Sequence, residues 1–167
     1  MLFDQAIDIP ECFEGDGLSV ALTGEKARYN LRLKSGDIEA VKKATKINFP
    51  KQIGASSVAG GMQCYCLGPD EWVVVADAAQ KGKLDKMLAK ISTDFVCSVT
   101  DISHRNVAFE ISGPDAEKLI TVGCPLDMSL DAFPVGKVKR TVYESVTIML
   151  FRSGEEAFNI ECWRSFG

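Results

Sequence analysis

Alternation of large apolar side chains with small or polar ones marks two segments of the chain as half-buried β-strands. Residues 29–33 carry an apolar side chain at every second position, and residues 107–111 show the same pattern. Further strand candidates are apolar runs bounded by turn residues. These are residues 63–67, 72–76, 96–102, 146–151 and 157–162. The pattern therefore predicts many short strands.

Helical spacing of apolar residues predicts three helices. Residues 84–91 carry them at positions i, i+3, i+4 and i+7, which is typical of an amphipathic helix. Residues 38–44 and 116–123 carry shorter apolar faces that suit two further helices. Ser112, with Asp115 three residues later, matches a capping box for the helix at 116–123.

The two halves of the chain carry the same order of landmarks. Ser35-Gly36 and Ser112-Gly113 each follow an alternating strand and precede a helix, and they are 77 positions apart. The turn before Trp72 corresponds to the turn at residues 153–155 with an offset near 85. The larger offset indicates an insertion around residues 125–145. This agreement predicts a fold built by duplication.

The repeat and the length together predict the domain organisation. With 167 residues the chain has the size of one domain. We expect a single domain over residues 1–167 built from two pseudo-repeats, at about 18–95 and 96–167. Each repeat would be a β-α-β-β unit in mainly antiparallel sheets, which gives an α+β fold class.

Composition and charge exclude several functions. Hydrophobic residues make up 46% and charged residues 25%, values typical of a soluble globular protein. The net charge of −4 gives no attraction for nucleic acid or an anionic membrane. The first residues include Asp4 and Asp8, where a signal peptide would carry cations, and no apolar run is long enough to span a membrane. We expect a cytoplasmic protein.

The cysteines and glycines do not form recognisable metal or phosphate motifs. Six cysteines lie at positions 12, 64, 66, 97, 124 and 162 without C-x-x-C spacing, and the chain has one histidine. Several cysteines lie within apolar segments, as buried free thiols do. No glycine-rich segment matches G-x-G-x-x-G or a P-loop. We therefore expect no metal-binding and no cofactor-binding residue on this chain.

His104 is the only histidine of the chain, and its polar neighbours make it a candidate for acid–base chemistry. A turn histidine held by local hydrogen bonds, or one that contacts a partner, is the interpretation we favour. A Ser103–His104–Asp101 triad is unfavourable because neighbouring strand residues point to opposite faces. Asp101, Glu110 and Asp115 each have a structural role available, in a turn, on an exposed strand face and at a helix start. We expect no catalytic residue.

The aromatic residues suggest both core positions and surface contacts. Trp72 lies on a strand with three valines and is expected to anchor the core. Trp163 and Phe166 flank Arg164, and such residues dominate protein interfaces, although a core role for the two aromatics is equally supported. The candidate partner contacts are His104, Arg105, Trp163, Arg164 and Phe166.

Six short motifs occur in order along residues 65–167. They are Leu67-Gly-Pro-Asp-Glu-Trp72, Asp101-Ile-Ser-His-Arg105, Ile111-Ser-Gly-Pro-Asp115, Gly123-Cys-Pro-Leu-Asp127, Ala132-Phe-Pro-Val-Gly136 and Arg164-Ser-Phe166. In this combination and order, the chain resembles the gamma subunits of heterotetrameric sarcosine oxidase. Residues 1–60 match that family poorly.

The resemblance implies a fold and a role. The fold would be the duplicated α+β folate-binding fold of the glycine-cleavage aminomethyltransferase. The chain would be a non-catalytic structural subunit, with alpha, beta and delta subunits as partners. The complex would demethylate sarcosine oxidatively to glycine, with hydrogen peroxide and formaldehyde or methylenetetrahydrofolate as further products. FAD, FMN, NAD and tetrahydrofolate would lie on the alpha and beta subunits, and zinc on the delta subunit.

Two other functions are compatible with the same fold group. Stand-alone folate-binding proteins of iron–sulfur assembly carry Lys-Gly-Cys-Tyr-x-Gly-Gln-Glu, whereas residues 122–127 read Val-Gly-Cys-Pro-Leu-Asp here. An independent aminomethyltransferase is a much longer chain. The subunit hypothesis further predicts an exposed apolar patch larger than the few hundred Å² that are normal for a monomer.

Overall fold

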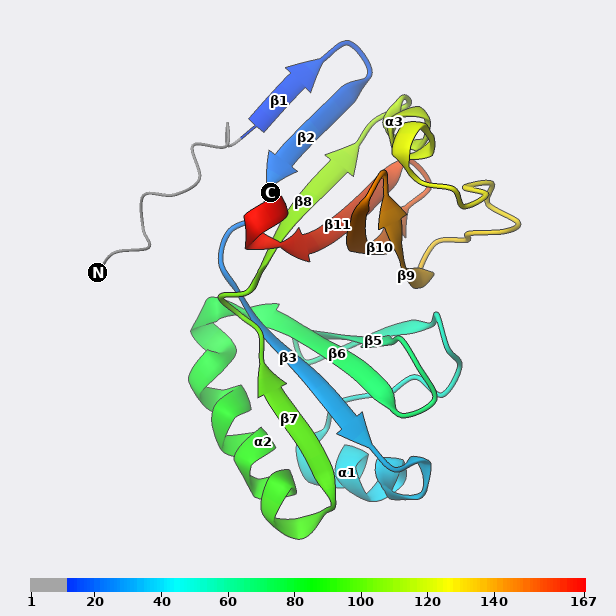
Figure 1. The fold of residues 1–167 in the computed structure, drawn as a ribbon. Coiled ribbons are helices and arrows are strands. Elements are labelled where there is room, and N and C mark those ends of the chain that lie inside the picture. The colour runs from blue at the N-terminus through cyan, green and yellow to red at the C-terminus, as the bar shows by residue number, and fades with distance from the viewer. Residues whose placement is uncertain (1–11) are drawn as a thin grey trace. The chain divides into compact units, whose positions relative to one another are not determined.

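The computed structural model describes residues 12–167, which group into two compact units. The central unit comprises Glu25–Ser103 and Gly136–Lys139. The terminal unit comprises the described residues up to Gly24, together with His104–Val135 and Arg140–Gly167. Each unit has its own sheet (Figure 1). Each unit also has its own hydrophobic core. The expected single domain over residues 1–167 stays a prediction.

The central unit has a five-stranded sheet in the order β4-β5-β6-β3-β7, and its pairs are antiparallel. Alternation in β3 (Lys26–Leu33) turns Tyr29 and Leu31 into the core, as predicted. Two helices, α1 (Ile38–Thr45) and α2 (Lys81–Asp94), bury their apolar stripes in the same core. The remaining strands are β4 (Ser56–Ala59), β5 (Met62–Cys66), β6 (Glu71–Asp77) and β7 (Cys97–Asp101).

The terminal unit has a six-stranded sheet in the order β1-β2-β8-β11-β10-β9. On β8 (Asn106–Ser112), Val107 and Ile111 are buried in the core, and α3 (Ala116–Gly123) packs Ile120 into it. The other strands are β1 (Cys12–Gly15), β2 (Leu18–Leu22), β9 (Val138–Tyr143), β10 (Val146–Gly154) and β11 (Ala157–Trp163).

The two sheets repeat one topology. In the central unit β3 and α1 are followed by β4, β5 and β6, and β6 returns to pair with β3. In the terminal unit β8 and α3 are followed by β9, β10 and β11, and β11 pairs with β8. The predicted β-α-β-β unit is therefore one strand short. The missed strands, β4 and β9, are edge strands in which polar residues interrupt the apolar pattern.

One strand of each sheet comes from the chain segment that precedes the other repeat. The strand β2 precedes β3 in sequence but pairs with β8, and β7 precedes β8 but pairs with β3. The predicted repeat limits, near 18–95 and 96–167, therefore do not coincide with the compact units. Sequence periodicity finds the strands, whereas this exchange depends on pairing between distant segments.

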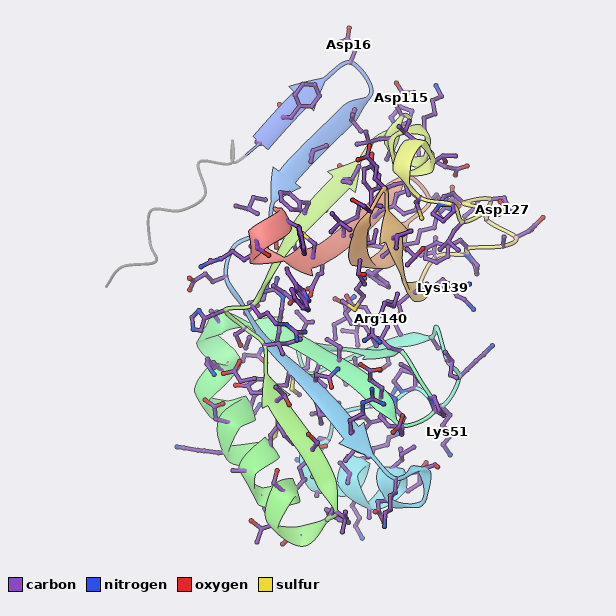
Figure 2. All side chains as sticks on the ribbon, viewed as in Figure 1. Asp16, Lys51, Asp115, Asp127, Lys139 and Arg140 are labelled. Carbon is purple, nitrogen blue, oxygen red and sulfur yellow. The ribbon has the colours of Figure 1, made fainter. Side chains whose placement is uncertain are left out.

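The predicted capping box at the start of α3 is wrong. The helix begins at Ala116 after Asp115, and no side chain caps it. The backbone N–H of Asp115 donates instead to the carbonyl oxygen of Gly17, at 3.0 Å. Gly113 has φ +112°, and a Cβ on it would lie 2.5 Å from the same oxygen. The segment Ser112-Gly-Pro-Asp115 therefore binds the β1–β2 turn, which carries Asp16, through the backbone of Asp115 (Figure 2).

Candidate functional site

Four of the five predicted contact residues meet where β11 ends. The turn η3 (Arg164–Phe166) follows this strand, and the backbone N–H of Arg164 donates to the carbonyl oxygen of Arg105 at 2.8 Å. The guanidinium carbon of Arg105 lies 5.5 Å from the centroid of the Trp163 ring. The ring centroids of Trp163 and Phe166 are 6.4 Å apart. We call Arg105, Trp163, Arg164 and Phe166 the aromatic cluster.

The aromatic cluster faces solvent. Trp163 is 53% exposed and Phe166 is 59% exposed, so neither ring belongs to a core of the described residues, and their role as partner contacts stays a prediction. An arginine over an exposed tryptophan ring contributes about 0.5–1 kcal/mol. The stacking and the backbone bond from Arg164 thus hold two aromatic side chains in a defined position on the surface.

His104 is adjacent to this cluster in sequence and is exposed. Within residues 12–167 its imidazole makes no hydrogen bond, so the local bonds expected for a turn histidine are not formed. Its predicted role as a partner contact stays a prediction.

A pocket of about 340 Å³ opens in the terminal unit beside the aromatic cluster. Its lining is mainly apolar, with β8 and β11 contributing Phe109 and Ile160. Val20 and Val146 line it from neighbouring strands, and Phe166 belongs both to the pocket and to the cluster. The sequence analysis missed this pocket, because alternation shows which side chains face a core but not how much of that face a helix covers.

Asp101 and Ser103 do not form a triad with His104. The Ser103 hydroxyl donates to Asp101 Oδ1 at 2.6 Å, and Lys81 Nζ donates to Asp101 Oδ2 at 2.6 Å. Desolvation raises the pKa of Asp101, but the hydrogen bonds from Lys81 and Ser103 outweigh it and lower the pKa to about 2. Asp101 is therefore an ionised structural residue of the central unit.

The same lysine ties the first turn of α2 to the sheet of the central unit. Lys81 Nζ donates to the Tyr29 hydroxyl at 2.8 Å, and that hydroxyl donates to Asp85. Desolvation, followed by the bond to Asp85, raises the pKa of Tyr29. A tyrosine that stays protonated and a lysine that stays charged suit a structural link between β3 and α2 better than proton transfer.

A buried arginine organises the long loop of the terminal unit. Arg152 is 1% exposed and donates from Nη1 to the carbonyl oxygens of Met128 and Phe133, at 2.6 and 3.1 Å. It also pairs with Glu117 at 3.3 Å. The buried side chain of Arg152 thus holds the loop between α3 and β9 in place through hydrogen bonds to its backbone. The sequence carries a weak signal for this residue, because Arg152 falls on the apolar face of β10.

The other chemistry-bearing groups of the described residues are dispersed. Between residues 12 and 167, no three His, Cys, Asp or Glu side chains gather in a way that could hold a metal ion. All six cysteines are free thiols, and burial raises the pKa of Cys64 far above its ordinary value. None of the helices described for this chain is long and apolar enough to cross a membrane.

Comparison with known proteins places these features in a family. The profile of the GCVT N-terminal domain matches residues 54–167. Sarcosine oxidase subunit gamma of Corynebacterium sp. (strain P-1) is 31% identical over 128 residues, which are 75% of this chain and 62% of that protein. The Arthrobacter sp. subunit gamma is 28% identical over 72% of this chain and 59% of its own length. The chain thus matches less than two thirds of these relatives' length.

Two solved structures share the fold. Heterotetrameric sarcosine oxidase from Corynebacterium sp. U-96, in complex with pyrrole 2-carboxylate, matches with a TM-score of 0.83 at 23% identity over 93% of this chain and 81% of that chain. Glycine cleavage system aminomethyltransferase T from Bartonella henselae matches with a TM-score of 0.68 at 16% identity over 87% of this chain and 42% of that chain.

These comparisons confirm the predicted aminomethyltransferase-like α+β fold and the resemblance to sarcosine oxidase gamma subunits. The family profile covers residues 54–167, well over half of the chain, and the chain therefore belongs to the family of the GCVT N-terminal domain.

Proposed function

We propose that this chain is the gamma subunit of a heterotetrameric sarcosine oxidase and has a structural, non-catalytic role in it. The names of its relatives support the proposal, and so does the fold shared with a solved complex. Its partners would be the alpha, beta and delta subunits, and the assembly would work in the cytoplasm.

The complex would convert sarcosine to glycine, with hydrogen peroxide and formaldehyde or methylenetetrahydrofolate as further products. The partner subunits would hold FAD, FMN, NAD, tetrahydrofolate and zinc, and this chain would hold none of them. Two acidic residues that the sequence offered for catalysis form ion pairs within this chain, which agrees with a non-catalytic role. Asp101 is paired with Lys81, and Asp115 is paired with Lys118 at 2.5 Å.

The aromatic cluster is the observation that carries the structural role. Tryptophan, phenylalanine and arginine are enriched in protein interfaces, and a few such residues supply most of the binding energy. Here two aromatic rings are more than half exposed and are held beside two arginines. Removing this apolar surface from water would favour association, and the part of that gain that exceeds the cost of ordering the two partners would appear as affinity.

Co-purification of co-expressed subunits tests the proposal. The affinity-tagged chain should retain the alpha, beta and delta subunits, and a Trp163→Ala/Phe166→Ala variant should lose most of them. Ile53→Ala, which truncates a 54% exposed side chain in the central unit, is the matched control and should retain them. Unchanged retention by the double variant would contradict the role of the cluster.

Folate binding by the isolated chain is a second candidate, because the pocket of about 340 Å³ has the volume of a small ligand site. The charges of the lining disfavour it. Glu144 is the one charged residue among the described lining residues, and the two carboxylates of a folate tail require cations. Calorimetric titration with tetrahydrofolate separates the two functions, because heat at micromolar ligand would support binding and its absence would exclude it.

A further inference from the structure

The lysines of this chain are concentrated in the helices of the central unit and the segments that flank them. Nine of the 13 lysines lie within residues 34–51 and 81–90, which contain most of the helical layer and no arginine. The central unit has 14 Lys and Arg side chains against nine Asp and Glu, whereas the described part of the terminal unit has five against 11. The positive charge of the described residues thus belongs to one unit.

One side of α2 carries a row of lysines. Lys83, Lys86 and Lys90 follow one another at spacings of three and four residues, so they share one face of the helix over about 10 Å. All three are exposed, while Leu84 and Leu88 of the same helix are buried in the core. Within residues 12–167, none of the three lysines forms an ion pair. We call Lys83, Lys86 and Lys90 the basic stripe.

The charges of α2 are arranged against the stability of the helix. Its first turn holds Lys83 and no acidic residue, and its last residue is Asp94, although the helix dipole favours the opposite order. Lys86 has a like charge three residues before it and another four residues after it, which is also unfavourable. The helix α1 has the favourable order, with an acidic first turn and lysines in the last turn. Helix stability therefore does not explain the basic stripe, and such conflicts are expected at functional surfaces.

The surroundings of the basic stripe favour an acidic protein over a membrane or a nucleic acid. None of the large apolar side chains that are exposed in the described residues lies on α1 or α2, so these helices have nothing to insert into lipid. Neither helix contains an aromatic residue on which a base could stack. Lysine attracts carboxylates over a distance but is depleted from the buried centres of interfaces. The stripe therefore suits long-range attraction to acidic side chains of another protein.

We propose that the basic stripe guides this chain onto an acidic surface of a partner subunit. The inference rests on the proposed function, because it requires an assembled complex. The acidic surface carries several carboxylates spread over about 10 Å, the length of the stripe. Charge complementarity of this kind raises the association rate. Because acids are in excess in the described part of the terminal unit, such a surface also distinguishes the two units and orients the chain on approach.

Zero-length cross-linking of the co-expressed complex tests the inference. A carbodiimide joins a lysine amine to a carboxylate where the two are in contact, and mass spectrometry identifies the pair. The lysines of the basic stripe should be joined to Asp or Glu residues of one partner subunit. Lys26 and Asp77, which are paired at 2.6 Å within this chain, are the positive control for the reaction. If the control pair is joined but the stripe is not, or if the stripe is joined only to this chain, within one copy or between two, the inference is overturned.

Competition for limiting partner subunits measures the size of the effect. The unmodified chain and a Lys83→Gln/Lys86→Gln/Lys90→Gln variant are co-expressed with the partners in equal amounts. The variant should be recovered in the complex at least about 10-fold less often than the unmodified chain. Its melting temperature should be unchanged or higher, because glutamine is a good helix former and the repulsion along α2 is removed. A loss of less than about 2-fold overturns the inference.

A matched control removes the same charge outside the basic stripe. The Lys51→Gln/Lys118→Gln/Lys139→Gln variant changes three exposed lysines and should compete within about 2-fold of the unmodified chain. An equal loss with this variant would show that net charge alone acts, and overturns the inference.

Two further outcomes separate this inference from other partners and from the proposed function. A DNA duplex or phosphatidylserine vesicles that bind the unmodified chain at about 0.15 M salt, but not the stripe variant, would assign the stripe to another polyanion and overturn the inference. If the chain joins the partners and the stripe variant joins them equally well, the proposed function stands and this inference fails. If the unmodified chain never joins the partners, both fail.

Discussion

The carbonyl oxygen of Gly17 lies 2.5 Å from the position that a Cβ atom on Gly113 would occupy, which leaves no room for a side chain there. Gly113 also has φ +112°, a backbone conformation that L-residues other than glycine rarely adopt. Backbone strain and close approach therefore act on the same residue, and they explain the glycine of the Ser112-Gly-Pro-Asp115 motif.

Gly113→Ala should destabilise the protein by at least about 2 kcal/mol, because the new methyl group meets the Gly17 backbone at a strained φ. Its counterpart in the other repeat, Gly36, has open space around it. Gly36→Ala should be neutral or stabilising by up to about 1 kcal/mol. Urea unfolding of both variants measures the difference, and equal effects would contradict the distinction between the two repeats.

Arg152→Met should cost about 3–5 kcal/mol, because it leaves the carbonyl oxygens of Met128 and Phe133 buried without their donor. Limited proteolysis should then cleave within residues 124–137. Lys139→Met removes an exposed charge on β9 and should change stability by less than about 0.5 kcal/mol. Normal protease resistance of Arg152→Met would show that the loop is held by other contacts.

Stability should depend on pH through Asp101, whose pKa is lowered to about 2 although desolvation acts to raise it. A carboxyl group with a depressed pKa stabilises the fold above its unfolded pKa of about 3.9, and this contribution is lost as the pH falls toward 2. The Asp101 side chain is 41% exposed, so screening limits the effect to below about 1 kcal/mol.

Asp101→Asn should thus be less stable than the unmodified chain at pH 7. The difference between their free energies of unfolding should narrow between pH 4 and pH 2. Asp16→Asn removes the same charge in the exposed β1–β2 turn and is the control. Chemical unfolding at pH 7, 4 and 3 measures both. A gap that is constant over this range would show that the ion pair with Lys81 contributes nothing.

Arg105→Ala should separate assembly from folding. The contact with Trp163 is exposed, so the melting temperature should change little, whereas affinity for the partner subunits should fall at least about 10-fold. Arg105→Lys keeps the charge but loses the flat guanidinium group that lies over the ring, and should be intermediate. Sedimentation of the co-expressed subunits measures the affinity. A large loss of thermal stability without loss of assembly would indicate a purely structural arginine.

The sequence predicts the regular elements well and the connections between distant segments poorly. Alternation locates β3 and β8, and helical spacing locates α2, because each pattern reflects one buried face. Edge strands such as β4 and β9 lack such a face. The exchange of β2 and β7 between the sheets depends on long-range pairing that no local pattern encodes.

In the candidate site, too, local sequence indicates the residue types, whereas contacts between distant segments decide where they meet. The residues around Trp163 suggest either a contact surface or core packing, and the structure brings Arg105 over the exposed Trp163 ring through the pairing of β8 with β11. The pocket beside it arises from the part of a sheet face that α3 leaves open, which depends on helix placement rather than on residue type.

Native mass spectrometry of the four co-expressed chains tests the central claim most directly. The account predicts one assembly in which this chain adds its 18.2 kDa to the alpha, beta and delta subunits. It also predicts that the Trp163→Ala/Phe166→Ala chain is folded but missing from that assembly. A complete assembly of the other three subunits, with this chain always recovered alone, would contradict the account.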